Sequence, residues 1–444
     1  MRVPAAALAV AVVLAGCLGG VPARDASRAD LVGTPVAPFA FHPAVAVSKE
    51  WPGSEPVVAV ASDGTLFVEG VGFVEGGLLA VNKVFRSRDG GATWMDVTPE
   101  GLGEQGSVDG FVAVGNGDRV YAQNSGATTF QLFRSDDLGE SWIPLPAPKF
   151  PVAMHRSWIV PEGAATLHVV YEALPPSYLV PQVPANPNEG LWYFRSDDRG
   201  LTWSAPRQID PIPNFAGQGN LVVANGSLYV PRYVDAADPP RYERGQWYLI
   251  ASEDEGRTWE RREMFALTSE LAGAVLSLAA DGRGVLHFAW AQAAGNVSRV
   301  FTASSADGGR SWSAPFEVSA NGTQALPWIA ARGDGEATLV WYEADAEGLA
   351  SRVDAPWHVV AARVAGAHGE APAVARTRVT ADPVHEGNIC AKGPACRGKD
   401  DRRLLDYPWV AFGPEGEAHL VFASTMWKRP SAFAIHAREA LAAP

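Results

Sequence analysis

Positive charge and cysteine are both scarce in this chain of 444 residues. Lysine and arginine number 36 against 49 aspartates and glutamates, which gives a formal net charge of −13. Proteins that bind nucleic acid or an anionic membrane surface rely on basic patches, so we expect neither as the main partner. Three cysteines are too few for a zinc-type cluster, and the sequence has no phosphate-binding loop. We therefore expect no metal and no cofactor.

Long apolar runs are also lacking, apart from a short one at the N-terminus. Met1-Arg2 is followed by the apolar stretch Val3 to Ala15, which is too short for a stable transmembrane helix. Leu14-Ala15-Gly16-Cys17 has the form of a lipobox, in which small residues precede a cysteine that is lipidated after cleavage. We expect a lipoprotein signal peptide over 1–16 and a lipidated Cys17 with a flexible tether over 17–37. The body should then be soluble, at the cell surface and extracytoplasmic, and attached to the membrane through the lipid anchor only.

The other two cysteines lie close together in a loop that contains glycine and proline. Cys390 and Cys396 fall within an insertion that spans residues 381–406. Outside the cytoplasm, an isolated pair of this kind favours a disulfide that closes a small loop. A metal site would need more ligands, and His385 alone does not supply them.

One eight-residue motif occurs five times, at intervals of roughly 50 to 60 residues, a period typical of propeller blades. The five copies are SRDGGATW from Ser87, SDDLGESW from Ser135, SDDRGLTW from Ser196, SEDEGRTW from Ser252 and SADGGRSW from Ser305. The aspartate can bind backbone N–H groups, and the following glycine supplies a position free for positive φ. The apolar residues before each serine and the tryptophan after it predict two strands joined by this turn.

The motif resembles the Asp-box, or BNR repeat, found in sialidases and in many other β-propellers. The resemblance implies an all-β fold, a β-propeller of four-stranded blades with Asp-box hairpins, as a single domain over 38–444. A carboxylate that recurs in every blade cannot converge on one substrate, so the box aspartates are expected to be structural.

A second repeat gives the number of blades. Seven segments share a short apolar strand, a turn that contains glycine and a second apolar strand, which predicts seven blades, with six as the alternative. The last blade lacks an outer strand, and the stretch Phe39 to Val47 is available to supply it and to close the ring. The seven segments are Pro56–Val68, Phe111–Ala122, Trp158–Tyr171, Leu221–Val230, Ala274–Trp290, Trp328–Trp341 and Trp409–Phe422.

Blade geometry indicates which face can hold a ligand. The start of the innermost strand and the end of the second strand lie on the face opposite the Asp-box turn. Residues expected around the channel mouth on that face include Glu55, Asp109, His155, Arg156, Gln218, Asn220, Asp406 and Tyr407 at strand starts, and Tyr171, Glu172, Arg232, Tyr342 and Glu343 at strand ends.

The resemblance to sialidases implies three arginines that clamp a substrate carboxylate, a tyrosine nucleophile activated by a glutamate, and an aspartate as acid and base. Candidates for the clamp are Arg156, Arg232 and Arg402. Asp109, Tyr342, Glu343 and Asp406 are the candidate catalytic residues. Other candidate ligand-binding residues are His155, Asn220, Tyr407 and Tyr171.

One element departs from the sialidase pattern. Sialidases carry Arg-Ile-Pro at the start of the first blade, whereas Trp51 to Pro56 contains no arginine. Two functions therefore remain open. The first is a surface protein that binds, and in the enzyme form hydrolyses, a glycan or other small polar ligand at the channel mouth. Convergence of Asp109, Arg156, Asp406 and the tyrosines in an open pocket would favour it. The alternative is a non-catalytic scaffold or assembly factor that binds a protein partner, which a channel plugged by apolar side chains would favour.

Overall fold

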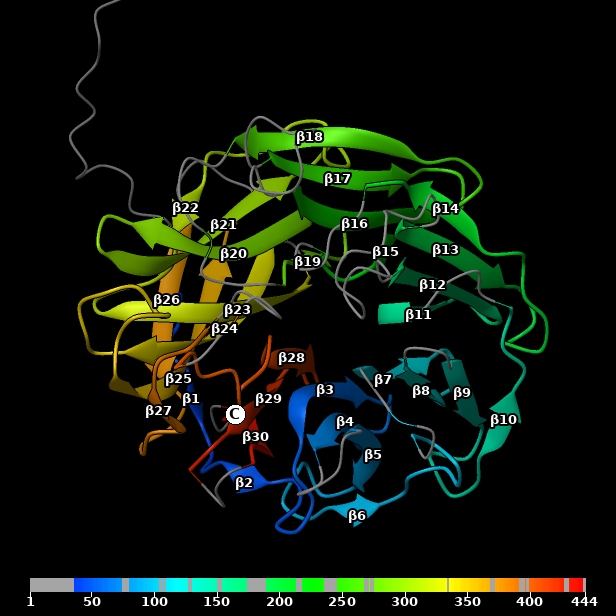
Figure 1. Cartoon of the computed structure of the whole chain (residues 1–444), viewed down its shortest axis with the longest axis horizontal. Helices are drawn as coiled ribbons and strands as arrows, with labels where there is room; N and C mark the ends of the chain where they lie inside the picture. The colour runs from blue at the N-terminus through cyan, green and yellow to red at the C-terminus, as the bar shows by residue number, and fades with distance from the viewer. Residues whose placement is uncertain are drawn as a thin grey trace, which may run out of the picture. The chain divides into compact units, whose positions relative to one another are not determined.

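The chain forms a ring of seven antiparallel sheets. The structure, a computed structural model, describes residues 36–73, 80–103, 106, 109–126, 130–149, 154–173, 189–212, 218–234, 246–266, 271, 275–333, 335–367, 372–390, 396, 399–426 and 431–441. Each sheet contains four strands in the order of a propeller blade, two of the sheets have a fifth strand beside these, and Figure 1 shows the sheets arranged around a common centre. The predicted all-β propeller with seven blades is confirmed, and the six-blade alternative is wrong.

Each of the first six blades is built from four consecutive strands, and blade 7 from the last three strands together with the first. Blades 1 to 3 contain β3 (Ser54–Val60), β4 (Leu66–Phe73), β5 (Ala80–Ser87), β6 (Met95–Asp96), β7 (Asp109–Gly115), β8 (Arg119–Ser125), β9 (Phe130–Ser135), β10 (Ile143–Leu145), β11 (Met154–Glu162), β12 (Thr166–Ala173), β13 (Gly190–Ser196) and β14 (Arg207–Asp210). Blades 4 to 6 contain β15 (Val222–Ala224), β16 (Ser227–Val234), β17 (Gln246–Ser252), β18 (Glu260–Ala266), β19 (Ser277–Ala280), β20 (Leu286–Ala294), β21 (Val297–Ser305), β22 (Phe316–Glu317), β23 (Thr323–Arg332), β24 (Glu336–Ala344), β25 (Ala355–Ala365) and β26 (Ala373–Arg378), with β27 (His385–Gly387) paired to β25. Blade 7 contains β28 (Trp409–Phe412), β29 (Ala418–Ser424), β30 (Phe433–Ala440) and β1 (Ala40–Phe41), with β2 (Val45–Ala46) also paired to β30.

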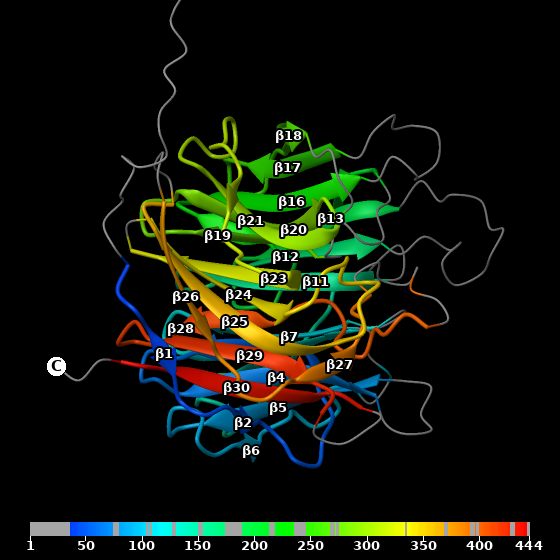
Figure 2. The same cartoon turned by 90° about the vertical axis from the view of Figure 1, so that its left-hand side faces the viewer.

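The ring is closed by strands from opposite ends of the chain. Ala40 in β1 pairs with Ala440 in β30, and Val45 in β2 pairs with His436. Figure 2 shows β1 beside β30. The prediction that Phe39 to Val47 supplies the outer strand of the last blade is confirmed. The pairing covers an edge of β30 that would otherwise present unpaired backbone groups.

The Asp-box turns have the geometry that the motif predicts. In blade 2, the Asp137 carboxylate accepts hydrogen bonds from the backbone N–H of Ser141 at 2.9 Å and from its hydroxyl at 2.5 Å. Ser135 Oγ accepts the N–H of Gly139 at 2.7 Å, and Gly139 has a φ of +79°. The Ser141 hydroxyl bond, then its N–H bond, lowers the pKa of Asp137 to about 2. The same contacts recur in the other four boxes, so these carboxylates are engaged in the turns.

The box tryptophans join neighbouring blades. Trp142 Nε1 in blade 2 donates to the carbonyl of Val97 in blade 1 at 2.7 Å, and Trp203 Nε1 in blade 3 donates to that of Pro146 in blade 2 at 2.8 Å. Trp94 of blade 1 packs edge-on against His436 of blade 7, with ring centroids 5.3 Å apart. The tryptophans therefore contact the preceding blade, and the contact continues across the closure of the ring.

Two faces follow from the antiparallel order. The Asp-box turns connect the third and fourth strands and lie on one face. The innermost strands begin on the opposite face, which we call the front face. Within the described residues, no helix is both long and apolar enough to traverse a bilayer. The predicted signal peptide, Cys17 and most of the tether lie outside those residues.

Candidate functional site

Three innermost strands begin with a backbone irregularity that redirects a side chain. The pairing register shifts between Ser54 and Val57 in β3 and between His155 and Trp158 in β11. Glu55 and Arg156, inside these two shifts, each have a φ of +47°. Positive φ is uncommon for residues other than glycine and costs on the order of 1–3 kcal/mol, so the surrounding structure must enforce it. The third such strand is β23, where the shifted residue is the apolar Leu326.

The redirected Arg156 side chain reaches across the ring. Its Nη2 atom contacts Asp406 Oδ2, and Arg402 holds the same carboxylate with two bonds, at 2.9 Å to Oδ1 and 3.0 Å to Oδ2. Arg156 and Asp406 are buried, whereas the Arg402 side chain is 26% exposed. Burial opposes ionisation of Asp406, but Arg156 and then Arg402 hold its pKa well below the usual range. Asp406 is therefore an ionised buried carboxylate shared by two guanidinium groups.

Glu55 and Asp109 add two further acids. The Asp109 Oδ2 atom accepts the backbone N–H of Arg156 at 2.7 Å, and the Glu55 side chain is hydrogen-bonded to Asp406. Burial, then the neighbouring Asp406 charge, raises the pKa of Glu55 well above its ordinary value. A hydrogen bond between two carboxyl groups requires a proton, so Glu55 and Asp406 share one. Together, Glu55, Asp109, Arg156, Arg402 and Asp406 form what we call the central cluster.

His155 lies at the edge of the central cluster. Its Nε2 atom is 3.9 Å from Asp109 Oδ2. Burial lowers the pKa of His155 to about 4, although the nearby Asp109 works in the opposite direction. His155 is therefore neutral at pH 7, and the charge of the central cluster comes from its acids and arginines alone.

Several buried polar atoms around Arg156 have no hydrogen-bond partner among the described residues. They are Nε and Nη1 of Arg156, Oε1 of Gln218 and the indole Nε1 of Trp158. Gln218 uses its amide nitrogen to donate to the Arg156 carbonyl at 3.3 Å, which places it beside the same residue. Buried donors and acceptors are nearly always paired in proteins, and such an atom indicates a site for water or a ligand.

Aromatic side chains lie directly next to the central cluster. Trp158, Trp328 and Trp409 stack on one another, with the Trp328 and Trp409 ring centroids 4.1 Å apart. Phe111 and Tyr407 pack against this stack at 5.4 and 5.0 Å. Burial raises the pKa of Tyr407 well above its ordinary value. Side chains from the inner strands of four blades therefore fill the middle of the ring.

Arg232, the third predicted clamp residue, belongs to a different cluster. Its guanidinium donates to Glu172 at 2.6 Å and to the Ile212 carbonyl at 2.7 Å, and its Nε lies 3.2 Å from Asp210. Asp210 also accepts hydrogen bonds from Tyr248 and Arg261 at 3.0 and 2.7 Å. This group joins blades 3 and 4, and Arg232 is fully buried within it.

Tyr342 and Glu343 are not brought to the central cluster. The Tyr342 hydroxyl donates to the Ala423 carbonyl at 3.2 Å and accepts the Ala423 N–H at 2.9 Å, which fixes blade 6 to blade 7. Glu343 lies 3.5 Å from the Gln324 amide, and burial raises its pKa. The pair extends to opposite sides of β24, as expected for neighbouring residues on a strand.

Tyr171 and Asn220 also make contacts within and between blades. Tyr171 is buried and stacks on Trp192 with centroids 6.3 Å apart. The Asn220 side chain exchanges two hydrogen bonds with the backbone of Leu278, at 2.8 and 2.9 Å, and so joins blade 4 to blade 5.

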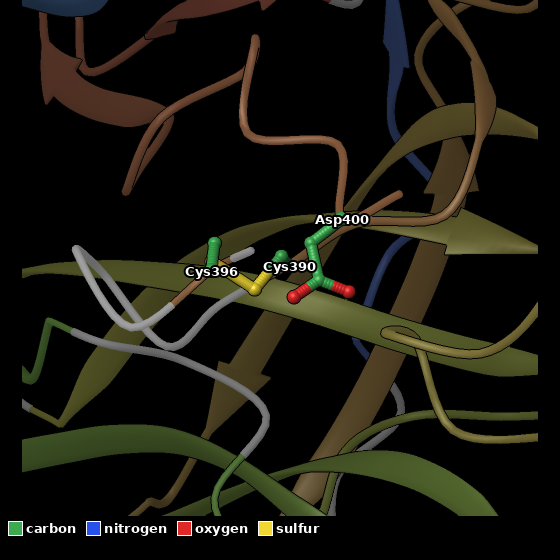
Figure 3. A group of neighbouring side chains, drawn as sticks. All are labelled: Cys390, Cys396 and Asp400. Carbon is green, nitrogen blue, oxygen red and sulfur yellow. A yellow bond between two sulfur atoms is a disulfide. The ribbon is translucent and has the colours of Figure 1, made fainter. Parts of the chain in front are cut away.

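The insertion over 381–406, before blade 7, contains a disulfide and a backbone hydrogen bond close to Arg402. Cys390 and Cys396 form the predicted disulfide, shown with Asp400 in Figure 3. The two sulfurs and a carboxylate oxygen of Asp400 lie within 4.8 Å of one another, but sulfurs bonded to each other are not thiolate ligands for a metal. The Cys390 N–H donates to the Asp401 carbonyl at 2.9 Å, one residue before Arg402. This backbone hydrogen bond joins the disulfide loop to the segment that carries Arg402 and Asp406.

Four residues that complete these clusters have contacts that the sequence does not indicate. Glu55, Glu172 and Gln218 are expected at the channel mouth from their places at strand ends, whereas nothing local in the sequence marks Asp210. A signal was present for Glu55, because it stands immediately before Pro56 at the start of an inner strand. Contacts between blades, such as that of Asp210 with Arg232, leave no local trace in the sequence.

Comparisons with known proteins agree with the repeat and the ring. Residues 180–344 match the family model of the BNR repeat-like domain. No curated protein matches the sequence. Among solved structures, a protein of unknown function from Dyadobacter fermentans DSM 18053 is similar with a TM-score of 0.51 and 14% identity, over 92% of this chain and 100% of that one.

Two other similar structures are of proteins that act on carbohydrates. The phage phi92 endosialidase has a TM-score of 0.50 and 12% identity, over 91% of this chain and 70% of that one. An ulvan lyase, a polysaccharide lyase bound to a glucuronic acid and sulfated rhamnose unit, has a TM-score of 0.42 and 11% identity, over 74% of this chain and 79% of that one. The motif, the ring, the family match over 180–344 and the similarity to the phage phi92 endosialidase show a seven-bladed β-propeller with BNR repeats and a sialidase-like fold.

Proposed function

We propose that this protein binds a carbohydrate on the front face, over the central cluster. The observation that carries the proposal is the set of buried donors and acceptors around Arg156 that lack partners. An oxygen-rich ligand supplies both kinds of partner at once, because each hydroxyl donates one hydrogen bond and accepts others. The central cluster also adds carboxyl oxygens and the part-exposed Arg402 to the same place.

The fold and the chemistry of the acids support this choice of ligand. The phage phi92 endosialidase shares the fold at 12% identity, which makes carbohydrates the first ligand class to test. The pKa of Glu55 is raised and that of Asp406 is lowered, and the two carboxyl groups share a proton in one hydrogen bond. Glycosidases also use two carboxyl groups, but theirs lie about 5 Å or more apart, whereas those of Glu55 and Asp406 are hydrogen-bonded to each other. Binding is therefore tested first, and hydrolysis is tested once binding is found.

The protein is proposed to work outside the cytoplasm, anchored by a lipid on Cys17. The Cys390–Cys396 disulfide supports an oxidising compartment. Metabolic labelling with a palmitate analogue should mark the wild type and leave Cys17→Ser unmarked, and the variant should leave the membrane fraction. Labelling of Cys17→Ser equal to that of the wild type would overturn the anchor.

The fragment that starts at Leu18 tests the ligand. It is screened on a glycan array and against a panel of fluorogenic glycosides, together with Arg402→Gln and Arg403→Gln. These adjacent arginines are a matched pair, since Arg402 holds Asp406 and Arg403 holds Asp401 outside the central cluster. We expect binding that Arg402→Gln weakens at least tenfold and that Arg403→Gln leaves unchanged.

The outcomes separate the possibilities. Turnover lost in Asp406→Asn identifies a glycosidase, and binding without turnover identifies a lectin-like protein. Equal loss in both arginine variants, or no binding to any glycan, contradicts the proposed site.

The aromatic stack favours a second candidate, a protein-binding scaffold. The centre of the ring is occupied by Trp158, Trp328 and Trp409, as expected for a propeller that does not conduct a ligand through its channel. Crosslinking in intact cells, followed by mass spectrometry, tests this candidate. A single partner crosslinked to front-face residues, with an empty glycan array, would support the scaffold over the carbohydrate-binding protein.

A further inference from the structure

The charge balance of the central cluster indicates which carbohydrates it accepts. Building on the proposed carbohydrate-binding function, we propose that the glycan is uncharged where it meets the front face, and that a carboxylated sugar such as a sialic or uronic acid is rejected.

Both arginines of the central cluster already serve an internal carboxylate. Asp406 is bound by Arg156 through Nη2 and by Arg402 through two bonds. Asp109 and Glu55 stand beside them, so two guanidinium groups face three carboxyl groups. The guanidinium groups do not outnumber the carboxyl groups that face them, so no net positive field remains to attract an anion.

The remaining predicted clamp arginine is compensated in the same way. Arg232 is fully buried and lies against two carboxylates, Glu172 and Asp210. Arg261 also contacts Asp210 and is 42% exposed, which makes this second group neutral as a whole. None of the three arginines that could clamp a ligand carboxylate is therefore free of an internal acid.

A ligand carboxylate would have to displace Asp406 from its arginines. The displaced Asp406 would then be a buried charge without a partner, and such a charge is strongly unfavourable. A hydroxyl avoids this exchange. It can accept a hydrogen bond from Nε or Nη1 of Arg156, which remain unpartnered within the described residues, and donate to an acid of the central cluster. Hydrogen-bonding capacity is available at this site, whereas uncompensated positive charge is not.

Matched pairs of sugars test the inference on the wild-type fragment. Lactose is compared with 3′-sialyllactose, and galactose oligomers are compared with galacturonic acid oligomers of equal length, by calorimetry at 150 mM salt. Wherever the neutral member binds, we expect its Kd to be at least tenfold lower than that of its acidic partner. An acidic member that binds equally well or better overturns the inference while leaving carbohydrate binding intact.

A second measurement does not depend on finding the natural glycan. Saturation-transfer NMR with N-acetylneuraminic acid should show no binding to the wild type. Asp406→Asn removes the internal competitor and keeps the shape, so the variant should gain binding of this acid. Asp401→Asn is the control, because it removes one charge from the same insertion but not from the central cluster.

The two measurements distinguish a failure of the proposed carbohydrate binding from a failure of the inference about charge. If the wild type binds no glycan on the array and only Asp406→Asn binds N-acetylneuraminic acid, the proposed function is contradicted but the inference about charge is supported. Binding of the acid by the wild type contradicts the charge argument directly. If Asp406→Asn does not fold, the wild-type comparisons decide the matter alone.

Discussion

Arg156 donates a hydrogen bond to Asp406, a residue 250 positions later in the chain, from the opposite side of the ring. Arg156 begins the inner strand of blade 3, and Asp406 precedes that of blade 7. Blades 3 and 7 are not neighbours, so this ion pair spans the channel. It connects parts of the ring that share no sheet and no Asp-box contact.

Breaking this pair should be costly. Asp406→Ala leaves Arg156 buried without its partner, and we expect a loss of about 3–5 kcal/mol in the free energy of unfolding. The double variant Arg156→Met with Asp406→Leu removes both charges and should recover most of that loss. Denaturant titrations of the two single variants and the double variant measure the coupling. If the loss of unfolding free energy in the double variant equals the sum of the losses in the single variants, Arg156 and Asp406 are not coupled.

Replacing Glu55 should stabilise the protein at neutral pH. The folded state raises the pKa of Glu55, so the folded protein holds a proton that the unfolded chain releases as the pH rises above about 4.5. Stability is therefore lost above that pH, by up to about 1.4 kcal/mol per pH unit. Glu55→Gln removes this dependence, and its advantage over the wild type should appear at pH 7 and be absent at pH 4.

The control for this experiment is Glu50→Gln, which changes an exposed glutamate nearby. Denaturation curves at pH 4, 5.5 and 7 for both variants provide the comparison. A Glu55→Gln variant that is less stable than the wild type at pH 7 would show that its charged form is the one the fold requires.

Two adjacent aspartates in blade 2 should differ sharply in their effect on stability. Asp137 accepts the Ser141 N–H and hydroxyl inside the box, whereas Asp136 pairs with Arg119 and Arg134 on the surface. Asp137→Ala leaves a turn donor unpaired and should cost about 1–3 kcal/mol. Asp136→Ala should cost less than about 1 kcal/mol. Thermal unfolding of the two variants compares them, and equal effects would contradict a structural role specific to the box aspartate.

Acid should destabilise the protein below about pH 6.5, partly through His436. Burial, then the neighbouring His419, lowers the pKa of His436 to about 3. As the pH falls from 6.5 to 3, the unfolded chain binds a proton on this histidine, whereas the folded protein does not. The free energy of unfolding therefore falls by up to about 1.4 kcal/mol per pH unit. His155, with its pKa of about 4, adds to the loss above pH 4.

His436→Gln tests this assignment. The variant should flatten the dependence of stability on pH between 6.5 and 3 by the slope of one proton, and His42→Gln, at an exposed site, should leave it unchanged. Unfolding curves at intervals of half a pH unit show the slopes. The same slope in wild type and His436→Gln would assign the acid sensitivity to other groups.

The fold could be read from the sequence because its determinants are local. Each Asp box contains its own serine, aspartate and glycine, so the turn geometry of Ser135, Asp137 and Gly139 follows from eight consecutive residues. The need for an outer strand in blade 7 likewise followed from counting strands along the chain.

The central cluster was harder to predict because it depends on contacts between blades. Asp109 and Arg156 lie at the starts of inner strands, and Asp406 precedes one, which their places in the repeats indicate. The partners were not predictable, since Asp406 takes both arginines and Arg232 turns instead toward Glu172 and Asp210. Such pairings depend on how far each side chain extends and on the bulges that redirect Glu55 and Arg156, and neither has a short sequence signature.

The pairing of Ala40 with Ala440 sets a temporal order for the molecule. Strand β1 is synthesised before β30, so its backbone groups cannot form their pairing until β30 has been made. Until then, blades 1 and 6 lack a neighbour on one face, and we expect this open arc to be the state that associates most readily with a second copy of the chain. We therefore expect the yield of closed rings to depend on how soon β30 pairs with β1 as well as on the stability of the single blades.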